Sequence, residues 1–290
     1  DIDAFTDYPK SKELDLTDIW ILSKLNTTIN NVNKAYDSYK MNDAIKIVYD
    51  FVYSDFCDWY IEFSKTRFYG TDEKSRRTAL NVSVYCMRTI LKLLHPYTPY
   101  ITEELWNYFS IDEENMLIEE SWPEINLDAI NKKSEQNLDI IKRTISSIRN
   151  IRAEMNISPG KEIDIIIKAA PNQIAVFEEL EPYISRLAKI DNITIDSNAL
   201  KPDQSASIVI DDNEIFIPLI GVIDIDVEIE RLSKQIDAYK GRLKNVTNKL
   251  NNKNFVDRAP KEIVNNEKNK QNKYQTILKK IEDNLQSLKK

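Results

Sequence analysis

The feature that most constrains this chain is a heptad repeat in its last quarter. Apolar or aromatic residues recur at alternating spacings of three and four at Ile229, Leu232, Ile236, Tyr239, Leu243, Val246 and Leu250. After a break at 251–260, a second seam runs through Tyr274, Leu278, Ile281, Leu285 and Leu288. Such spacing places each set on one stripe of an α-helix. Because two such helices joined by a short turn bury their stripes against each other, residues 224–290 are predicted to form an antiparallel coiled-coil hairpin.

The same segment reverses the charge of the chain. Residues 228–290 hold 13 Lys and 3 Arg against 5 Glu and 3 Asp, a net charge of +8, whereas the whole chain of 290 residues carries −7. An acidic body with a basic arm is typical of a protein that grips a polyanion at one end. Lysines also keep a coiled coil without any ligand soluble, and charge alone leaves both interpretations open. A structural coiled coil that binds protein partners is a further alternative.

Residues suited to catalysis are scarce. The chain has one histidine, His95, two cysteines, Cys57 and Cys86, and four scattered glycines. One copy cannot assemble a four-ligand Cys/His zinc site, and neither a P-loop nor a dinucleotide fingerprint occurs. We therefore expect no catalytic residue, no metal site and no cofactor in this chain, and we expect both cysteines to be reduced core thiols. The absence of a long apolar run or a signal-like start predicts a soluble, cytoplasmic protein.

The remaining pattern predicts a mainly α protein. Residues 1–16 are polar and read as a leader or linker. An antiparallel helix bundle is predicted over 17–125, with Thr17 as the first N-cap. Its helices are expected at 17–39 and 42–65, then, after a break at 68–72, through Leu80 to Leu94, and at 101–109. A small α+β connecting module is predicted over 126–223. Its expected elements are a helix at 132–155, a helix at 172–189 interrupted near Pro182, and strands at 163–168, 193–195, 206–210 and 215–218.

Four sequence runs carry a resemblance to a known family. Two of them are Asp55 to Glu62 (DFCDWYIE) and Leu93 to Trp106 (LLHPYTPYITEELW). These resemble the anticodon-binding helical bundle of class I aminoacyl-tRNA synthetases of the valine, isoleucine and leucine group. The runs Asn254 to Val264 (NFVDRAPKEIV) and Ile148 to Met155 (IRNIRAEM) are similar to the arm and to the segment after the bundle in the valine-specific members.

The resemblance implies a partner and a missing activity. It implies that the chain binds tRNA(Val), as a monomer, with no role for DNA or a membrane. The family activates its amino acid with ATP and Mg²⁺ in a domain bearing His-x-Gly-His and Lys-Met-Ser-Lys-Ser motifs, and neither motif occurs here. The bundle's usual earlier helix, with a Trp-Asn-Ala-like run, is also missing. We therefore expect a C-terminal fragment that is inactive alone. An isoleucine or leucine enzyme is the alternative, although the former commonly ends in a Cys-bearing zinc module.

Two sets of residues are candidates for tRNA contact under this resemblance. Bases of an anticodon loop stack on aromatic or guanidinium planes, and candidates around the turn after the second bundle helix are Lys65, Arg67, Phe68, Arg76 and Arg77. In the arm, cations would lie along phosphates at the outer corner of tRNA. The arm candidates are Lys244, Lys249, Lys253, Arg258, Lys261, Lys268, Lys270 and Lys273. The alternative for each is an ordinary solvated side chain.

Overall fold

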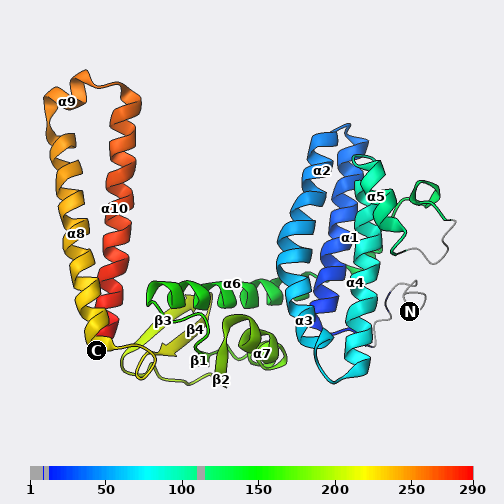
Figure 1. The fold of residues 1–290 in the computed structure, drawn as a ribbon, viewed down its shortest axis with the longest axis horizontal. Helices are drawn as coiled ribbons and strands as arrows, with labels where there is room; N and C mark the ends of the chain where they lie inside the picture. The colour runs from blue at the N-terminus through cyan, green and yellow to red at the C-terminus, as the bar shows by residue number, and fades with distance from the viewer. Residues whose placement is uncertain (1–8, 10–12, 110–114, 290) are drawn as a thin grey trace. The chain divides into compact units, whose positions relative to one another are not determined.

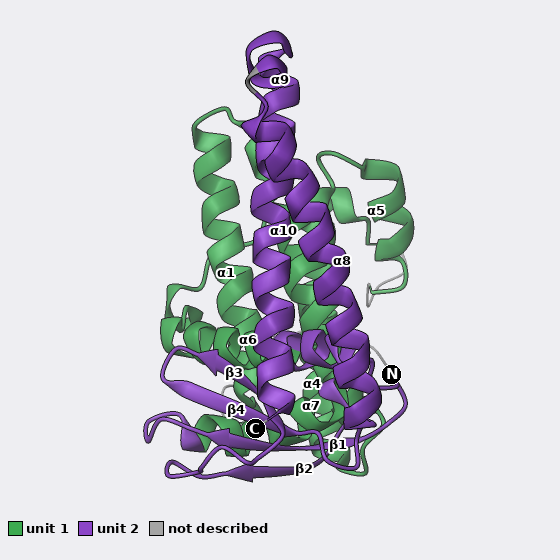
Figure 2. Cartoon of the chain, turned by 90° about the vertical axis from the view of Figure 1, so that its left-hand side faces the viewer, with its two compact units in different colours: residues 1–145, 175–187 green, residues 146–174, 188–290 purple. Residues whose placement is uncertain are grey.

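The computed structural model of the protein describes Pro9, residues 13–109 and residues 115–289, so the predicted leader at 1–16 lies mostly outside the described residues. The chain divides into two compact units, coloured separately in Figure 2. The first comprises residues up to 145 together with 175–187, and the second comprises residues 146–174 together with those from 188 onward. The described residues are mainly helical with one small mixed sheet, as predicted.

The first unit is a bundle of helices (Figure 1). Its elements are α1 (Leu16–Asp37), α2 (Met41–Asp50), the π-helical stretch η3 (Phe51–Ile61), α3 (Glu62–Phe68), α4 (Glu73–Leu94), α5 (Pro99–Trp106) and the short 3₁₀ turns η4 (Leu117–Glu119) and η5 (Leu127–Ala129). Residues 175–187 of the later helix α7 (Ile174–Ala188) also belong to this unit. The helix α6 (Lys132–Glu154) begins in this unit and ends in the second. The core contains Trp20, Phe63 and Tyr60, and the first two rings meet edge to face with centroids 6.3 Å apart.

The cap of α1 differs from the predicted one. Asp15, not Thr17, is the N-cap, and its side chain accepts a hydrogen bond from the backbone N–H of Asp18. The Asp18 carboxylate in turn accepts one from the backbone N–H of Asp15. This reciprocal capping box satisfies two helix-terminal donors at once, which a cap at Thr17 could not do because the residue three positions later is Trp20.

The predicted helix over 42–65 is one continuous helical rod that changes its winding. The stretch η3 is π-helical between α2 and α3. A π-helix has more residues per turn than an α-helix, so the side chains drift from the stripe that a 3.6-residue period predicts. Phe56 and Tyr60 remain buried, but Cys57 is exposed, so the prediction of a core thiol at Cys57 is wrong. Cys86 is free and buried, as predicted.

The second unit contains a four-stranded sheet of order β2-β1-β4-β3. Its strands are β1 (Ile163–Lys168), β2 (Ile190–Ile195), β3 (Ser205–Ile210) and β4 (Asn213–Pro218). β1 pairs parallel with β2 and antiparallel with β4, where Ile166 faces Phe216. The parallel pair requires a crossover, which α7 (Ile174–Ala188) supplies. α7 continues through Pro182, so the predicted interruption is wrong. Phe177 and Ile184, one on either side of the proline, are both fully buried, so side-chain packing favours the unbroken helix.

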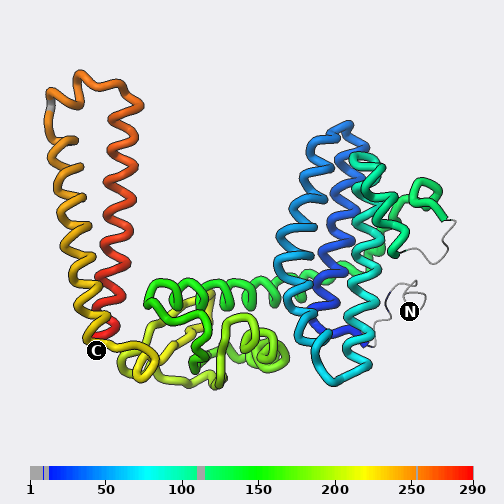
Figure 3. The backbone as a smooth tube through the Cα atoms, viewed as in Figure 1, coloured from blue at the N-terminus to red at the C-terminus, as the bar shows by residue number. Residues whose placement is uncertain are grey.

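The last elements form the predicted helical hairpin. α8 (Ile225–Asn251) and α10 (Lys261–Leu288) run side by side in opposite directions, and α9 (Lys253–Arg258) lies at their turn (Figure 3). The heptad stripe is the buried one: Leu232, Ile236 and Ile281 are all nearly inaccessible. Two cross-helix contacts fix the pairing, the Tyr239–Tyr274 rings at 5.9 Å and the hydrogen bond from Gln271 to Thr247 at 3.0 Å.

Candidate nucleic-acid interface

The distal half of the hairpin, residues 244–273, is strongly cationic. It holds eight basic and three acidic residues, so at least five positive charges have no acidic partner within this half. The predicted arm residues with exposed side chains are Lys244, Lys249, Arg258, Lys261, Lys268, Lys270 and Lys273. Lys253 is the first residue of α9, and its side chain lies outside the described part. The structure therefore gathers these residues on the two helix ends and on α9 between them.

One acidic residue lies within the seam of this distal half. Glu267 is buried, and its carboxylate pairs with Lys270 at 2.9 Å. The hydrogen bond from Lys270, together with the nearby charges of Lys249 and Lys270, lowers the pKa of Glu267. The negative charge at Glu267 therefore partly compensates Lys249 and Lys270.

The basal half of the hairpin is compensated by ion pairs instead. Lys234 pairs with Glu230 at 2.6 Å, and Lys240 of α8 reaches Glu282 of α10 at 3.3 Å. Arg231 pairs with the buried Glu228. Because paired charges present little net field, a polyanion is attracted to the distal half of the arm rather than to its base.

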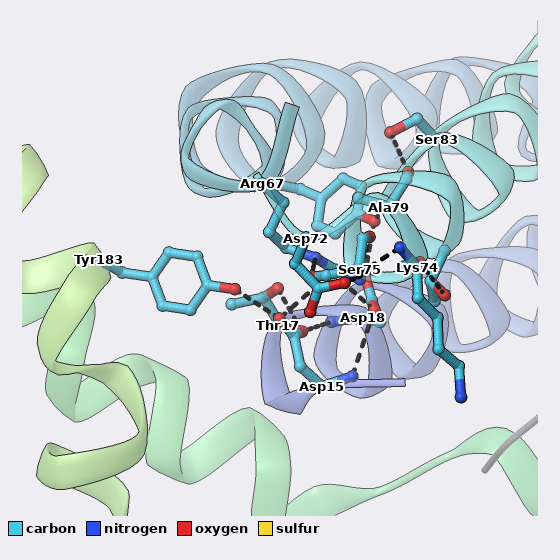
Figure 4. A network of polar contacts seen from close by, with 12 residues as sticks. Asp15, Thr17, Asp18, Arg67, Asp72, Lys74, Ser75, Ala79, Ser83 and Tyr183 are labelled. Atoms are coloured by element: carbon cyan, nitrogen blue, oxygen red, sulfur yellow. Dashed lines mark hydrogen bonds and ion pairs between the residues drawn. The ribbon is translucent and has the colours of Figure 1, made fainter. Parts of the chain in front are cut away.

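The second candidate set surrounds the turn between α3 and α4, where Arg67 departs from the prediction. Its side chain is 6% exposed, and its Nη1 donates to Asp18 Oδ2 at 2.7 Å. Its Nε and Nη2 donate to the hydroxyl and the carbonyl of Ser75 at 2.8 and 2.9 Å (Figure 4). All three nitrogens of this guanidinium therefore have a partner inside the protein, and the side chain is almost inaccessible. Its position does not support a contact with RNA, and Arg67 instead fixes the turn against α1.

The network around Arg67 joins three parts of the first unit. Tyr60 donates to Asp18 Oδ1 at 2.7 Å. Tyr183 of α7 donates to Asp15 (Figure 4). Burial, with a contribution from the charge of Asp15, raises the pKa of Asp18 to about 6, although Arg67 works in the opposite direction. The turn is thus anchored to α1, η3 and α7.

The other candidates of this set sit at the surface among acids. Lys65 pairs with Glu62, and Arg76 binds both oxygens of Glu73 at 2.7 and 2.8 Å. Arg77 is exposed and Phe68 is half-buried. Ion pairs therefore compensate much of the charge at this end of the bundle.

An aromatic residue that the sequence reading passed over lies at the same turn. Tyr69 is 78% exposed, and the guanidinium carbon of Arg186, in α7, lies 5.6 Å from its ring centroid. The sequence holds one signal for Tyr69, its place between the end of α3 and Gly70. No pattern in the sequence brings Arg186 to it, since 117 residues separate the two.

Neither metal chemistry nor membrane insertion is indicated by the described residues. In the part of the chain that the structure describes, no three His, Cys, Asp or Glu side chains gather as a metal site would require. Over the same ranges, no helix is both long and apolar enough to cross a membrane. His95 contacts the hydroxyl of Thr102 at 2.9 Å, at the turn between α4 and α5.

Comparison with known proteins gives matches along the whole chain. A family model described as the anticodon-binding domain of tRNA ligase matches residues 18–167, and one described as the valyl tRNA synthetase tRNA binding arm matches residues 224–289. The valine–tRNA ligase of Clostridium acetobutylicum is 38% identical over 97% of this chain and 32% of its own length. That of Thermosynechococcus vestitus is 37% identical over 88% of this chain and 28% of its own. The chain thus spans about a third of the length of these curated relatives.

Proposed function

Because the chain belongs to the family of anticodon-binding domains of tRNA ligases, we propose that it is the tRNA-holding part of a valine–tRNA ligase. The match of residues 224–289 to a valyl tRNA synthetase arm supports valine over isoleucine or leucine. The attachment of valine with ATP and Mg²⁺ would belong to another part of the enzyme, since residues here offer neither a His-x-Gly-His nor a Lys-Met-Ser-Lys-Ser motif. The work of this chain is binding and orientation.

The observation that carries the proposal is the charge excess on the distal half of the hairpin. Eight basic and three acidic residues are placed there, at the end of two long paired helices. Exposed lysines that lie along a phosphate backbone release condensed counterions, so each contact adds affinity that falls with salt. The base of the hairpin, where ion pairs compensate the charges, adds little to this salt-dependent affinity. The arm would therefore hold tRNA by its distal half.

The first experiment compares the full chain with one lacking residues 226–290. Binding of tRNA(Val) is measured by fluorescence anisotropy at several salt concentrations, with tRNAs for isoleucine and leucine as competitors. We expect the truncated chain to bind at least tenfold more weakly and with a flatter dependence on salt. An unchanged salt slope would contradict a role for the arm. Equal binding of the three tRNAs would contradict the assignment to valine.

A matched pair of variants locates the contact within the arm. Lys244→Glu with Lys268→Glu changes the distal half, and Lys279→Glu with Lys289→Glu makes the same charge change near the base. All four side chains are exposed. Only the distal variant should lower the salt slope, by about one for each lysine. Circular dichroism serves as the control for helicity in both.

A further inference from the structure

The turn between α3 and α4 differs from the arm in the kind of contact it can offer. Its cations are close to acids: Lys65 to Glu62, Arg76 to Glu73, and Lys74 to Glu13 at 3.2 Å. Surface pairs of this kind leave little net field for a phosphate. An RNA loop that meets this surface must be held chiefly by something other than charge.

Tyr69 supplies a different means of binding. Its ring is 78% exposed, although burial of an aromatic ring is favourable. The guanidinium of Arg186 lies over one face of the ring at 5.6 Å, within the range of a cation–π contact. With one face occupied by the guanidinium and most of the ring accessible, the opposite face is open to a planar ligand.

The turn holds the backbone of Tyr69 in a fixed place. The backbone N–H of Tyr69 donates to Lys65 O at 3.2 Å, and that of Gly70 donates to Arg67 O at 3.2 Å. A Cβ at position 70 would lie 3.0 Å from the carbonyl oxygen of Thr66, so the tight turn suits glycine. The buried guanidinium of Arg67 ties the end of α3 to Ser75 of α4. Because the backbone at Tyr69 is already ordered, a ligand that stacks on the ring has only the torsions of that side chain to order.

We propose that Tyr69, backed by Arg186, is a stacking platform for an unpaired base of an RNA loop. The proposal rests on the proposed function and adds a site that the charged candidates do not include. Bases of single-stranded loops stack on aromatic rings whatever their identity, because every base has a π-face. Tyr69 therefore contributes affinity rather than a choice between bases.

The test uses the full chain and tRNA(Val), with an RNA hairpin of the anticodon stem and loop as a second ligand. Tyr69→Ala should weaken the binding of both about tenfold and leave the salt slope unchanged, since stacking releases no counterions. Tyr69→Phe keeps the ring and should bind within about twofold of the wild type. Arg186→Gln should have an intermediate effect of about threefold.

Tyr100→Ala is the matched control, because Tyr100 is 91% exposed on α5 of the same unit. It should bind as the wild type does. A Tyr69→Ala variant that binds normally, or a Tyr69→Phe variant as weak as Tyr69→Ala, would overturn the platform while the proposed function stood. A lower salt slope in Tyr69→Ala would point to a phosphate contact and would also overturn it. A wild-type chain that binds no tRNA would overturn both proposals.

Discussion

At the scale of one residue, Asp18 shows the cost of burying an ionised carboxylate in the bundle. Its side chain is inaccessible to solvent, and Asp15 adds a second negative charge to the site. Arg67 and Tyr60 donate to its two oxygens, but desolvation is the larger effect and raises its pKa to about 6. A carboxyl group with a pKa above its value in the unfolded chain is destabilising when ionised. The buried pair of Asp18 and Arg67 thus fixes the position of the turn between α3 and α4 more than it stabilises the fold.

We predict that this group makes the protein more stable as the pH falls from 7 to 5. The folded pKa near 6 exceeds the usual 3.8, so the folded state takes up the proton first, and part of the penalty for the ionised group is relieved over this range, the rest only below the unfolded value. The gain from Asp18 is about 1 kcal/mol. Urea unfolding of the wild type and of Asp18→Asn at the two pH values measures it.

The asparagine variant retains an oxygen for Tyr60 but does not titrate. Its absolute stability should fall, because Arg67 loses its nearer carboxylate. Its gain between pH 7 and pH 5 should be smaller than that of the wild type. Equal changes in the two proteins would show that Asp18 does not carry this proton.

Single side chains are also where the sequence was least informative. A basic residue beside a turn is typical of an RNA contact, yet Arg67 is buried because Asp18, 49 residues earlier, lies opposite it. Cys57 is exposed because the winding of η3 departs from the period used to place it. In both cases the exposure of the side chain depends on tertiary packing. The local sequence pattern holds no information about that packing.

At the scale of elements, the hairpin is gripped at its base by the end of α6. The carboxylate of Glu154 pairs with Lys280 at 2.5 Å and lies 3.4 Å from the side-chain nitrogen of Asn284, both on α10. Arg231 of α8 donates to the backbone carbonyl of Glu154 at 2.9 Å. Both helices of the arm therefore contact one residue of α6, which fixes their direction within the second unit.

We predict that Glu154→Ala weakens tRNA binding about threefold without a loss of helicity, because the arm must then be ordered on binding. Fluorescence anisotropy with tRNA(Val) and circular dichroism give the two readouts. Glu230→Ala, which removes the exposed pair with Lys234, is the control and should bind normally. Equal binding by all three proteins would contradict this role of Glu154.

Elements with a strong period were predictable, and elements with a polar interior were not. The seam from Ile229 to Leu250 is apolar throughout, so α8 could be placed almost to the residue. The matching seam of α10 begins with Val264, Glu267 and Gln271, and because two of these are polar, the predicted apolar seam starts only at Tyr274, although the predicted break at 251–260 ends where α10 begins. Strand β2 extends three residues before its predicted start because polar Asp191 and Asn192 interrupt its alternation.

At the scale of the whole molecule, the absence of catalytic motifs leads to a direct expectation. The chain alone should show no valine-dependent exchange between ATP and pyrophosphate, because its one histidine cannot form a motif that needs two. A radiolabelled pyrophosphate assay measures this, with a complete valine–tRNA ligase as the positive control. Exchange above background would show that the chemistry lies within these 290 residues.

The bundle and the arm also differ in the order in which a growing chain can complete them. In the arm, Thr247 and Gln271 are 24 residues apart, so the hairpin closes on partners made almost together. In the bundle, Asp15 can accept its hydrogen bond from Tyr183 only after a further 168 residues have been synthesised. Contacts between distant residues form slowly, and synthesis proceeds from the N-terminus. The bundle, although it precedes the arm in the chain, is therefore finished only after α7 has left the ribosome, whereas the arm needs no other segment to pair its own helices.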